Sequence, residues 1–145
     1  MLDNIEEIFT GLEQMLKKLK KSSYEENMKT FRATQGHFID EMITYVKSRD
    51  DLNEASATVG KTFADGVFDA VSVNGKIKGR KQADMNFFMI YYVFPAILIT
   101  NEDCADSLCR GIRDAWNERF SDTNINFTDY DTLYNSFRNK IFGIF

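Results

Sequence analysis

The segment 85–100, MNFFMIYYVFPAILIT, is the feature that most constrains how this chain can fold. It contains no charged residue, and its apolar residues cover every face of a helix, so other elements must surround a helix formed here. A membrane-spanning helix needs about 18 or more apolar residues, which this segment does not supply. It therefore predicts a central core helix at about 84–99. Pro95, the only proline, predicts a kink or a restart, because it has no amide hydrogen and its ring displaces the carbonyl of Tyr91.

The length and composition indicate one folded unit. A chain of 145 residues fits a single domain, 1–145, and its 43% hydrophobic and 28% charged residues exclude a disordered chain. The net charge of −4 predicts no nucleic-acid and no membrane partner. The acidic segment 1–7 lacks the apolar core of a secretory signal, which predicts a cytoplasmic protein. Cys104 and Cys109 would point in different directions on a helix, so we expect two reduced, buried thiols.

Two segments near the N-terminus have apolar residues at alternating spacings of three and four, which is typical of helices that bury one stripe. A short polar turn with overlapping capping boxes separates them. We therefore predict an N-terminal antiparallel helical hairpin. The first stripe consists of Ile5, Phe9, Leu12, Leu16 and Leu19, and the second of Tyr24, Met28, Phe31, Gln35, Phe38, Met42 and Tyr45.

Three more helices are predicted in addition to the hairpin and the core helix. A capping box that starts at Asp51 opens one of them, and Gly60 and Gly66 within it suggest a close approach of another backbone. Thr100 or Asn101 is expected to cap the next helix. The apolar stripe of the first of these helices consists of Ala55, Val59, Phe63, Val67 and Val71. That of the second consists of Ala105, Leu108, Ile112, Trp116 and Phe120. The third helix is expected to start with a cap at Thr128, and its apolar positions are Leu133 or Tyr134, Phe137 and Ile141. The predicted fold class is all-α, a single-domain bundle of five or six helices around the apolar helix.

Three features that could indicate a catalytic or metal site lack the parts that such sites need. Residues 55–62 fit a loose P-loop pattern, but a charged turn precedes them where a buried strand is required. Residues 122–133 begin like a calcium loop, yet Phe127 replaces the required glycine and Leu133 the required glutamate. His37 is the only histidine, which excludes paired-histidine metal sites and predicts a structural or surface role. We predict no catalytic residue, no metal and no cofactor.

The connection 72–82 is one candidate binding site. Asn74-Gly75 within it could form a minimal hairpin, although a structured loop is the favoured interpretation because an isolated hairpin is marginally stable. Its cations could bind a phosphate or an acidic partner, or they could simply keep an exposed connection solvated. These cations are Lys76, Lys78, Arg80 and Lys81.

The aromatic residues around Pro95 are the other candidate site. A kinked helix with phenol groups can line a pocket for a small apolar or amphipathic ligand. The same rings can instead fill a core, with their hydroxyl groups bonded to the backbone, and this interpretation is favoured. The residues concerned are Phe88, Tyr91, Tyr92 and Phe94.

These observations predict a small helical protein without catalytic activity that acts through protein–protein contact, as a homodimer or with another protein. The aromatic content of 14%, the first hairpin and the apolar tail 143–145 favour this function. The alternative is a binding domain for a small apolar or amphipathic ligand near Pro95. A third possibility is an enzyme that acts on a phosphorylated substrate through Lys61 or the basic connection.

Overall fold

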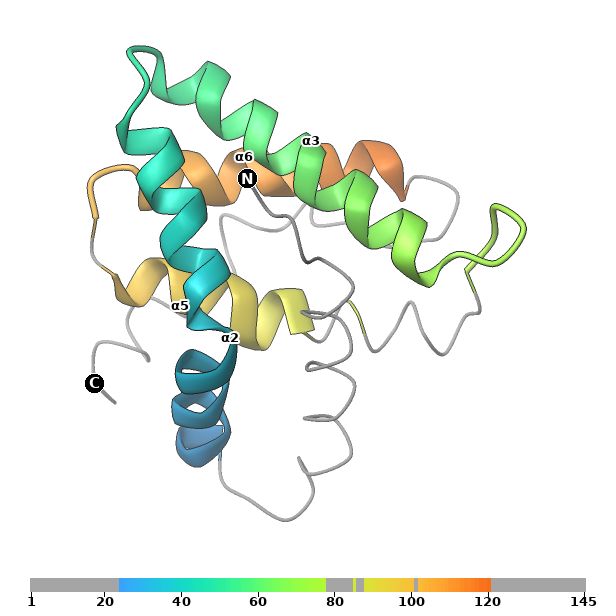
Figure 1. Cartoon of the computed structure of the whole chain (residues 1–145), viewed down its shortest axis with the longest axis horizontal. Coiled ribbons are helices and arrows are strands. Elements are labelled where there is room, and N and C mark those ends of the chain that lie inside the picture. The colour runs from blue at the N-terminus through green and yellow to red at the C-terminus, as the bar shows by residue number, and fades with distance from the viewer. Residues whose placement is uncertain (1–23, 78–84, 86–87, 101, 121–145) are drawn as a thin grey trace.

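The computed structural model describes residues 24–77, 85, 88–100 and 102–120, and these residues have the all-α fold that the sequence predicts (Figure 1). The helices are α2 (Tyr24–Lys47), α3 (Leu52–Val71), the π-helix η2 (Met89–Val93), α5 (Phe94–Ile99) and α6 (Ala105–Arg119). The predicted first helix at 5–19, and with it the N-terminal hairpin, lies outside the described residues. So do the last helix from Thr128 and the tail 143–145.

The helix α2 buries Met28, Phe31, Phe38 and Met42 of the predicted stripe, which are all inaccessible to solvent or nearly so, whereas Tyr45 is partly buried. A short connection leads from its end to Asp51, which caps α3. The Asp51 carboxylate accepts hydrogen bonds from the amides of Asn53 and Glu54, at 3.1 Å each, and so satisfies two of the donors that a helix start leaves unpaired. The predicted cap of this helix is confirmed.

The described part of the apolar segment lies mainly in the interior of the fold, as predicted. The amide of Phe94 bonds to the carbonyl of Met89, five residues earlier, and α5 then starts with Pro95 in its first turn. A π-helical turn is a recognised way of interrupting the α-helical hydrogen-bond ladder, and here it lies directly before the residue that cannot donate an amide hydrogen. The predicted restart at Pro95 therefore takes the form of a change of helix type. Every residue from Tyr92 to Leu98 is buried.

The helices α3 and α6 pack side by side and run in the same direction (Figure 1). Ser56 contacts Ser107 near the start of both helices, and Asp65 contacts Arg119 towards their ends. Because α3 and α6 run in the same direction, the chain must pass from the end of α3 back to the level of its start before α6 begins. The helices η2 and α5 make this passage on the other side of the core (Figure 1).

A tight turn follows α3. Val73 and Lys76 exchange two backbone hydrogen bonds around Asn74 and Gly75, which have φ angles of 55° and 74°. Positive φ at both central residues is the geometry of the two-residue turn that Asn-Gly favours. Within the described residues the pairing is a single bridge without strands, so residues 73–76 form an ordered turn, and this part of the connection agrees with the favoured interpretation. Residues 78–82 of the connection lie outside the described residues.

The helix α6 buries the predicted apolar stripe but begins later than predicted. Its N-cap is Cys104, without a side-chain hydrogen bond, so the prediction that Thr100 or Asn101 caps it is wrong. Thr100 instead ends α5, where its hydroxyl donates to the carbonyl of Ile97. The two cysteines are buried and form no disulfide bond with a described residue, as predicted.

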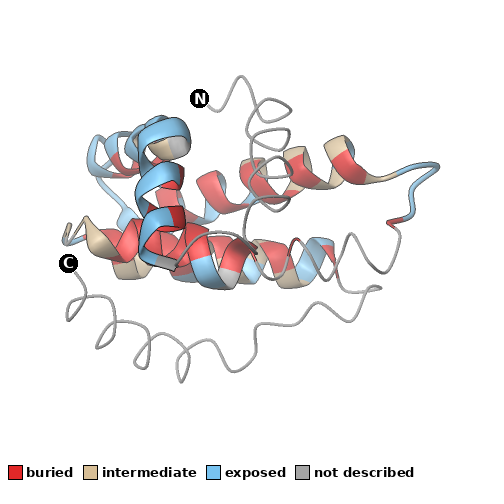
Figure 2. Cartoon of the chain, turned by 90° about the horizontal axis from the view of Figure 1, so that it is seen from below, coloured by how far each residue is buried: buried red, intermediate tan, exposed pale blue. Residues whose placement is uncertain are grey.

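The core contains a continuous series of aromatic contacts that links η2, α2, α3 and α6. Neighbouring ring centroids along it are 4.2 to 6.3 Å apart, distances at which aromatic pairs attract one another. Figure 2 shows the buried residues concentrated on the sides of the helices that face one another. In order, the rings are Phe88, Tyr92, Phe31, Phe38, Phe63, Trp116, Phe120 and Phe68. Among the described residues, no helix has the length and apolar character needed to cross a membrane.

Candidate functional site

The helices α3 and α6 approach each other closely, and this approach shapes the surface between them. A Cβ atom on Gly60 would lie 2.8 Å from the amide nitrogen of Ile112 and would also collide with the carbonyl of Gly111. A Cβ atom on Gly111 would lie 3.0 Å from the Cβ of Ser56. Each glycine therefore allows the other helix to approach, which confirms the prediction for Gly60.

Small residues recur at spacings of four on both helices. Ser56, Gly60 and Ala64 follow this spacing in α3, and Ser107, Gly111 and Ala115 follow it in α6. Residues four apart lie on one helix face, so both helices present a narrow small-residue ridge. The sequence therefore contained a signal for this pairing, namely the same small-residue spacing in two segments.

Polar contacts hold the two ends of this helix pair. At the N-terminal end, the hydroxyl of Ser56 donates to that of Ser107 at 3.1 Å, and Ser107 donates to the side-chain oxygen of Asn53 at 3.0 Å. At the other end, the Arg119 guanidinium lies 3.4 Å from the carboxylate of Asp65. The same guanidinium lies 3.7 Å from the carboxylate of Asp69 and 4.1 Å above the ring of Phe68. These contacts fix the register of α3 against α6.

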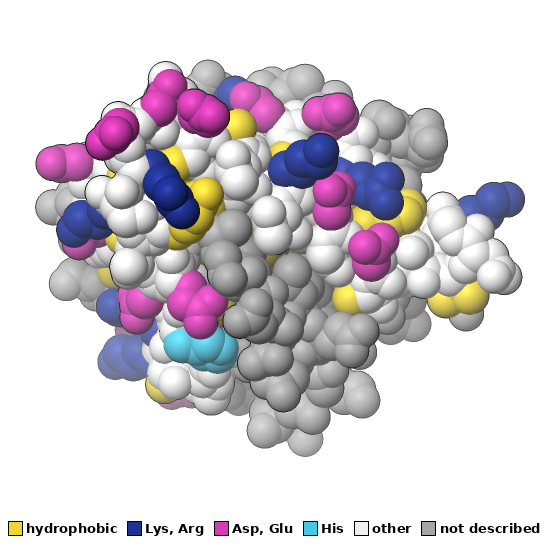
Figure 3. Space-filling model, turned by 45° about the horizontal axis from the view of Figure 1, so that its top comes forward, with side chains coloured by type: hydrophobic (Ala, Val, Ile, Leu, Met, Phe, Trp, Pro, Cys, Tyr) yellow, Lys and Arg dark blue, Asp and Glu magenta, His cyan; other side chains and the backbone are white. Residues whose placement is uncertain are grey.

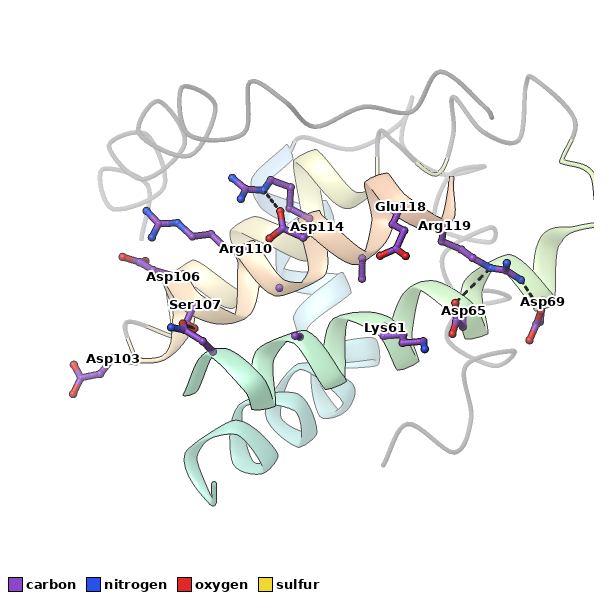
Figure 4. A pocket seen from close by; sticks show the side chains of 15 residues that line it. Lys61, Asp65, Asp69, Asp103, Asp106, Ser107, Arg110, Asp114, Glu118 and Arg119 are labelled. Carbon is purple, nitrogen blue, oxygen red and sulfur yellow. Dashed lines mark hydrogen bonds and ion pairs between the residues drawn. The ribbon is translucent and has the colours of Figure 1, made fainter. Parts of the chain in front are cut away.

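A groove of about 1140 Å³ runs between the two helices on their outer side, and we call it the α3–α6 groove (Figure 4). Short side chains at Ala57, Gly111 and Ala115 leave room between the helices, while long charged side chains form the walls. Figure 3 shows acidic and basic side chains interspersed on the surface, with few exposed hydrophobic ones. The acidic residues of the groove are Asp65, Asp69, Asp103, Asp106, Asp114 and Glu118, and the basic residues are Lys61, Arg110, Arg113 and Arg119.

Some of these charges are already engaged and others are not. Arg113 forms an ion pair with its neighbour Asp114 at 2.9 Å, and Arg119 is held between two aspartates. Lys61 on α3 and Glu118 on α6 are exposed, and neither forms an ion pair with another described residue. The groove therefore offers a cation and a carboxylate to an incoming molecule.

The candidate catalytic residues from the sequence can now be located relative to the groove. Among the described residues, no group of three histidine, cysteine or acidic side chains is arranged to hold a metal ion. His37 is exposed on α2 and does not line the groove. Lys61, from the loose P-loop pattern, lies within α3, where the backbone amides are used by the helix. The groove thus presents fixed charges and hydrogen-bonding groups on two packed helices.

The aromatic candidates from the sequence lie mainly in the core. Phe88, Tyr92 and Phe94 are buried, with exposures of 3%, 1% and 4%, whereas Tyr91 is 40% exposed. Tyr92 contacts the rings of Phe31 and Phe88. None of the four candidates lines the α3–α6 groove.

A smaller pocket of about 310 Å³ lies between α2 and α5, and we call it the α2–α5 pocket. Ala96 and Thr100 line it from α5 and its C-cap, opposite residues of α2 that include Arg32, Ala33 and Asp40. It is adjacent to Pro95 in the chain, but the four aromatic candidates do not line it.

The basic candidates are placed only in part. Lys76 is exposed in the turn after α3. Lys78, Arg80 and Lys81 lie outside the described residues. Of the four cations in this predicted site, the described residues therefore include Lys76 alone.

Burial shifts the ionisation of two core groups. It raises the pKa of the Tyr92 phenol, and a hydrogen bond with the side chain of Asn27 opposes that shift. Burial also raises the pKa of the Cys104 thiol, with a hydrogen bond to the backbone opposing it. A raised pKa keeps a thiol protonated and therefore unreactive, which is consistent with a structural role for Cys104.

Comparison of the chain with protein families, with curated proteins and with solved structures finds no match.

Proposed function

We propose that this chain is a non-catalytic protein-interaction domain and that the α3–α6 groove binds a segment of a polypeptide partner. The observation that carries the proposal is the groove itself, with a volume of about 1140 Å³ and walls of opposed charges. It extends along two helices that are packed against each other through Gly60 and Gly111.

The shape and lining of the groove support a polypeptide over a small molecule. Pockets for small ligands are mostly lined by apolar side chains. They also enclose most of the surface of the ligand. The α3–α6 groove is open and lined largely by charged side chains, which is the composition expected at the polar rim of a protein interface. A rigid pair of helices also reduces the entropy lost on binding, because its charged groups are already positioned.

The small-ligand alternative has weaker support. The three buried aromatic candidates, Phe88, Tyr92 and Phe94, sit within the core. The α2–α5 pocket close to Pro95 is lined by Arg32 and Asp40 as well as by apolar groups. We therefore place ligand binding there second.

We also propose a cytoplasmic location. The buried thiols of Cys104 and Cys109, which form no disulfide bond with a described residue, support it, because reduced cysteines persist in that compartment. The partner in this proposal is another protein or a second copy of the chain.

A matched pair of alanine substitutions tests the proposed function. Ala57 lines the α3–α6 groove and Ala33 lines the α2–α5 pocket, and both are exposed on helices. The probe is a displayed library of random linear peptides selected on the intact chain. Selected peptides should lose binding to Ala57→Arg and keep it with Ala33→Arg, with circular dichroism showing both variants folded.

Two outcomes would overturn the proposal. One is that no peptide is enriched over repeated rounds of selection. The other is that the enriched peptides bind Ala57→Arg as well as the unmodified chain. Loss of binding with Ala33→Arg alone would transfer the function to the α2–α5 pocket.

A further inference from the structure

We propose that Asn74 is a site of spontaneous chemical modification, at which the side-chain amide is converted to aspartate and isoaspartate through a cyclic imide. The proposal is independent of the α3–α6 groove, which Asn74 does not line. It follows from the geometry of the turn after α3 and from the residue that comes next in the chain.

The residue after Asn74 is a glycine, and Asn74-Gly75 is the only Asn-Gly pair in the sequence. Imide formation requires the backbone nitrogen of the next residue to reach the Cγ atom of the asparagine side chain. A side chain on that next residue hinders the approach, and glycine has none. Apart from the chain neighbours of Gly75, no heavy atom lies within 4 Å of the position that a Cβ atom would take on it, so the space beside it is open.

The backbone amide of Gly75 is not used to close the turn. The two hydrogen bonds that close it join Val73 and Lys76, at 2.8 and 3.1 Å, and do not involve the central residues. Gly75 forms no hydrogen bond with another described residue. Its nitrogen can therefore act as a nucleophile without breaking a hydrogen bond to the described part of the chain.

The turn is also accessible to water and easily opened. Figure 1 shows it projecting beyond the end of α3, and its four residues, Val73 to Lys76, are all exposed. A single bridge holds it. An exposed segment of this kind opens at a lower free energy than a packed helix, so the backbone can leave the conformation with a φ of 55° at Asn74. The side chain and the nitrogen of Gly75 can then meet.

The other described asparagines have the opposite environment. Asn27, Asn53 and Asn117 lie in α2, α3 and α6, and each is followed by a residue with a side chain. Asn27 is buried, and its side chain is hydrogen-bonded within the core. The amide that follows Asn53 donates to the cap of α3. Imide formation at these positions requires a helix to open, so Asn74 should be the most reactive of the four.

The reaction needs water as its only co-reactant. The nitrogen of Gly75 attacks the Cγ atom of Asn74 and forms the new C–N bond of the cyclic imide. The side-chain nitrogen leaves as ammonia and takes up the proton of the Gly75 amide. Water then opens the ring: cleavage of the bond to Cγ gives aspartate, and cleavage of the bond to the main-chain carbonyl carbon gives isoaspartate. No atom is oxidised or reduced.

Both products change the charge of the turn, and one of them changes its shape. Either product has a carboxylate in place of a neutral amide, two residues before Lys76, so the positive charge of the connection 72–82 falls by one. In isoaspartate the backbone runs through the side chain and gains one carbon atom. The two-residue turn that pairs Val73 with Lys76 then no longer fits.

Incubation of the intact chain in water enriched in the heavy oxygen isotope tests the proposal. After incubation at physiological pH and temperature, the chain is digested briefly in ordinary water and its peptides are analysed by mass spectrometry. The peptide with Asn74 should contain one oxygen atom from the labelled water and separate into two products. Its conversion should be about tenfold or more faster than at Asn27, Asn53 and Asn117, because a turn opens more readily than a packed helix.

Two substitutions provide the controls. Asn74→Gly suits the same turn, because glycine accepts a positive φ, and it should abolish the modification of this peptide. Gly75→Ala adds a side chain beside the attacking nitrogen and should slow the conversion several-fold. Because the φ of 74° at this position strains a side chain in the folded turn, Gly75→Ala and the unmodified chain are compared while both are unfolded in urea.

The outcomes decide each part of the proposal. Conversion at Asn74 no faster than at the three helical asparagines would overturn it. Conversion that occurs only in urea would also overturn it, since the folded turn would then protect the pair. Hydrogen exchange tests the effect on the turn: the Lys76 amide, which donates to the carbonyl of Val73, should lose its protection in the isoaspartate product. Retained protection would contradict the loss of the pairing.

Discussion

Tyr92 shows how a residue that the sequence places in a candidate pocket acts in the core. Its ring is 1% exposed and packs against Phe31 and Phe88, and its hydroxyl bonds to the side chain of Asn27. Its neighbour Tyr91 is 40% exposed. The two phenols are adjacent in sequence, so their different environments are set by the helix face on which each lies.

The buried phenol should make the stability of the protein depend on alkaline pH. The pKa of Tyr92 in the folded chain is raised above its ordinary value of 10.0, so the unfolded chain releases this proton at a lower pH than the folded chain. Between the two pKa values the unfolded state binds fewer protons, and the free energy of unfolding therefore falls as the pH rises. Below the lower value this contribution is fully present.

Tyr92→Phe removes the titrating group and should flatten that alkaline decline. It should also lower stability at neutral pH by about 1 kcal/mol, because the buried Asn27 loses a hydrogen-bond partner. Urea unfolding from pH 8 to 11 measures both effects, with Tyr91→Phe as the exposed control. A decline equally steep in Tyr92→Phe and in the unmodified chain would contradict the assignment.

At the scale of elements, the apolar spacing predicts which residues each helix buries but not which helices pair. Burial of Val59 and Phe63 follows from the pattern of one helix, which the sequence contains in full. The contact of Gly60 with Gly111 depends on the register between segments that are about fifty residues apart. The small residues at spacings of four occur in both segments, but this pattern does not by itself fix that register. The charged walls of the α3–α6 groove were also missed, because charges on one side of a helix are typical of any solvated face.

Alanine substitutions at two glycines test the pairing of α3 and α6. Gly60→Ala should lower the free energy of unfolding by about 1–3 kcal/mol, because its Cβ meets the backbone of Gly111 and Ile112 and the helices must separate. Gly36→Ala in α2 meets nothing within 4 Å and should raise stability by about 0.5–1 kcal/mol through helix propensity. Urea unfolding measures both.

The opposite signs are the informative result. A stabilising effect of Gly60→Ala similar to that of Gly36→Ala would show that the two backbones are not in close contact. The α3–α6 groove depends on a close approach of the two helices at their small residues, and this result would contradict that approach.

At the scale of the molecule, most of the aromatic residues that the structure describes lie in the core. A series of ring contacts from Phe88 to Phe68 joins η2, α2, α3 and α6. The charge-free segment predicted that such a core exists and that Pro95 interrupts it. The sequence of this segment could not predict the π-helix, because a kinked α-helix would equally accommodate a proline, which donates no amide hydrogen.

The recognition surface emerges only when the helices are assembled. Each charged residue of the α3–α6 groove has a sufficient local explanation as a solvated side chain, and only the parallel packing of α3 and α6 brings these residues into one feature. The central claim of this account is that this feature binds a polypeptide.

Amide chemical-shift mapping tests that claim most directly. The intact, isotope-labelled chain would be titrated to saturation with a peptide selected from the library. The account predicts that the largest shifts fall on residues that line the groove from both helices, including Ala57, Lys61 and Gly111. Shifts confined to the α2–α5 pocket, or to the surface around Tyr91, would contradict it.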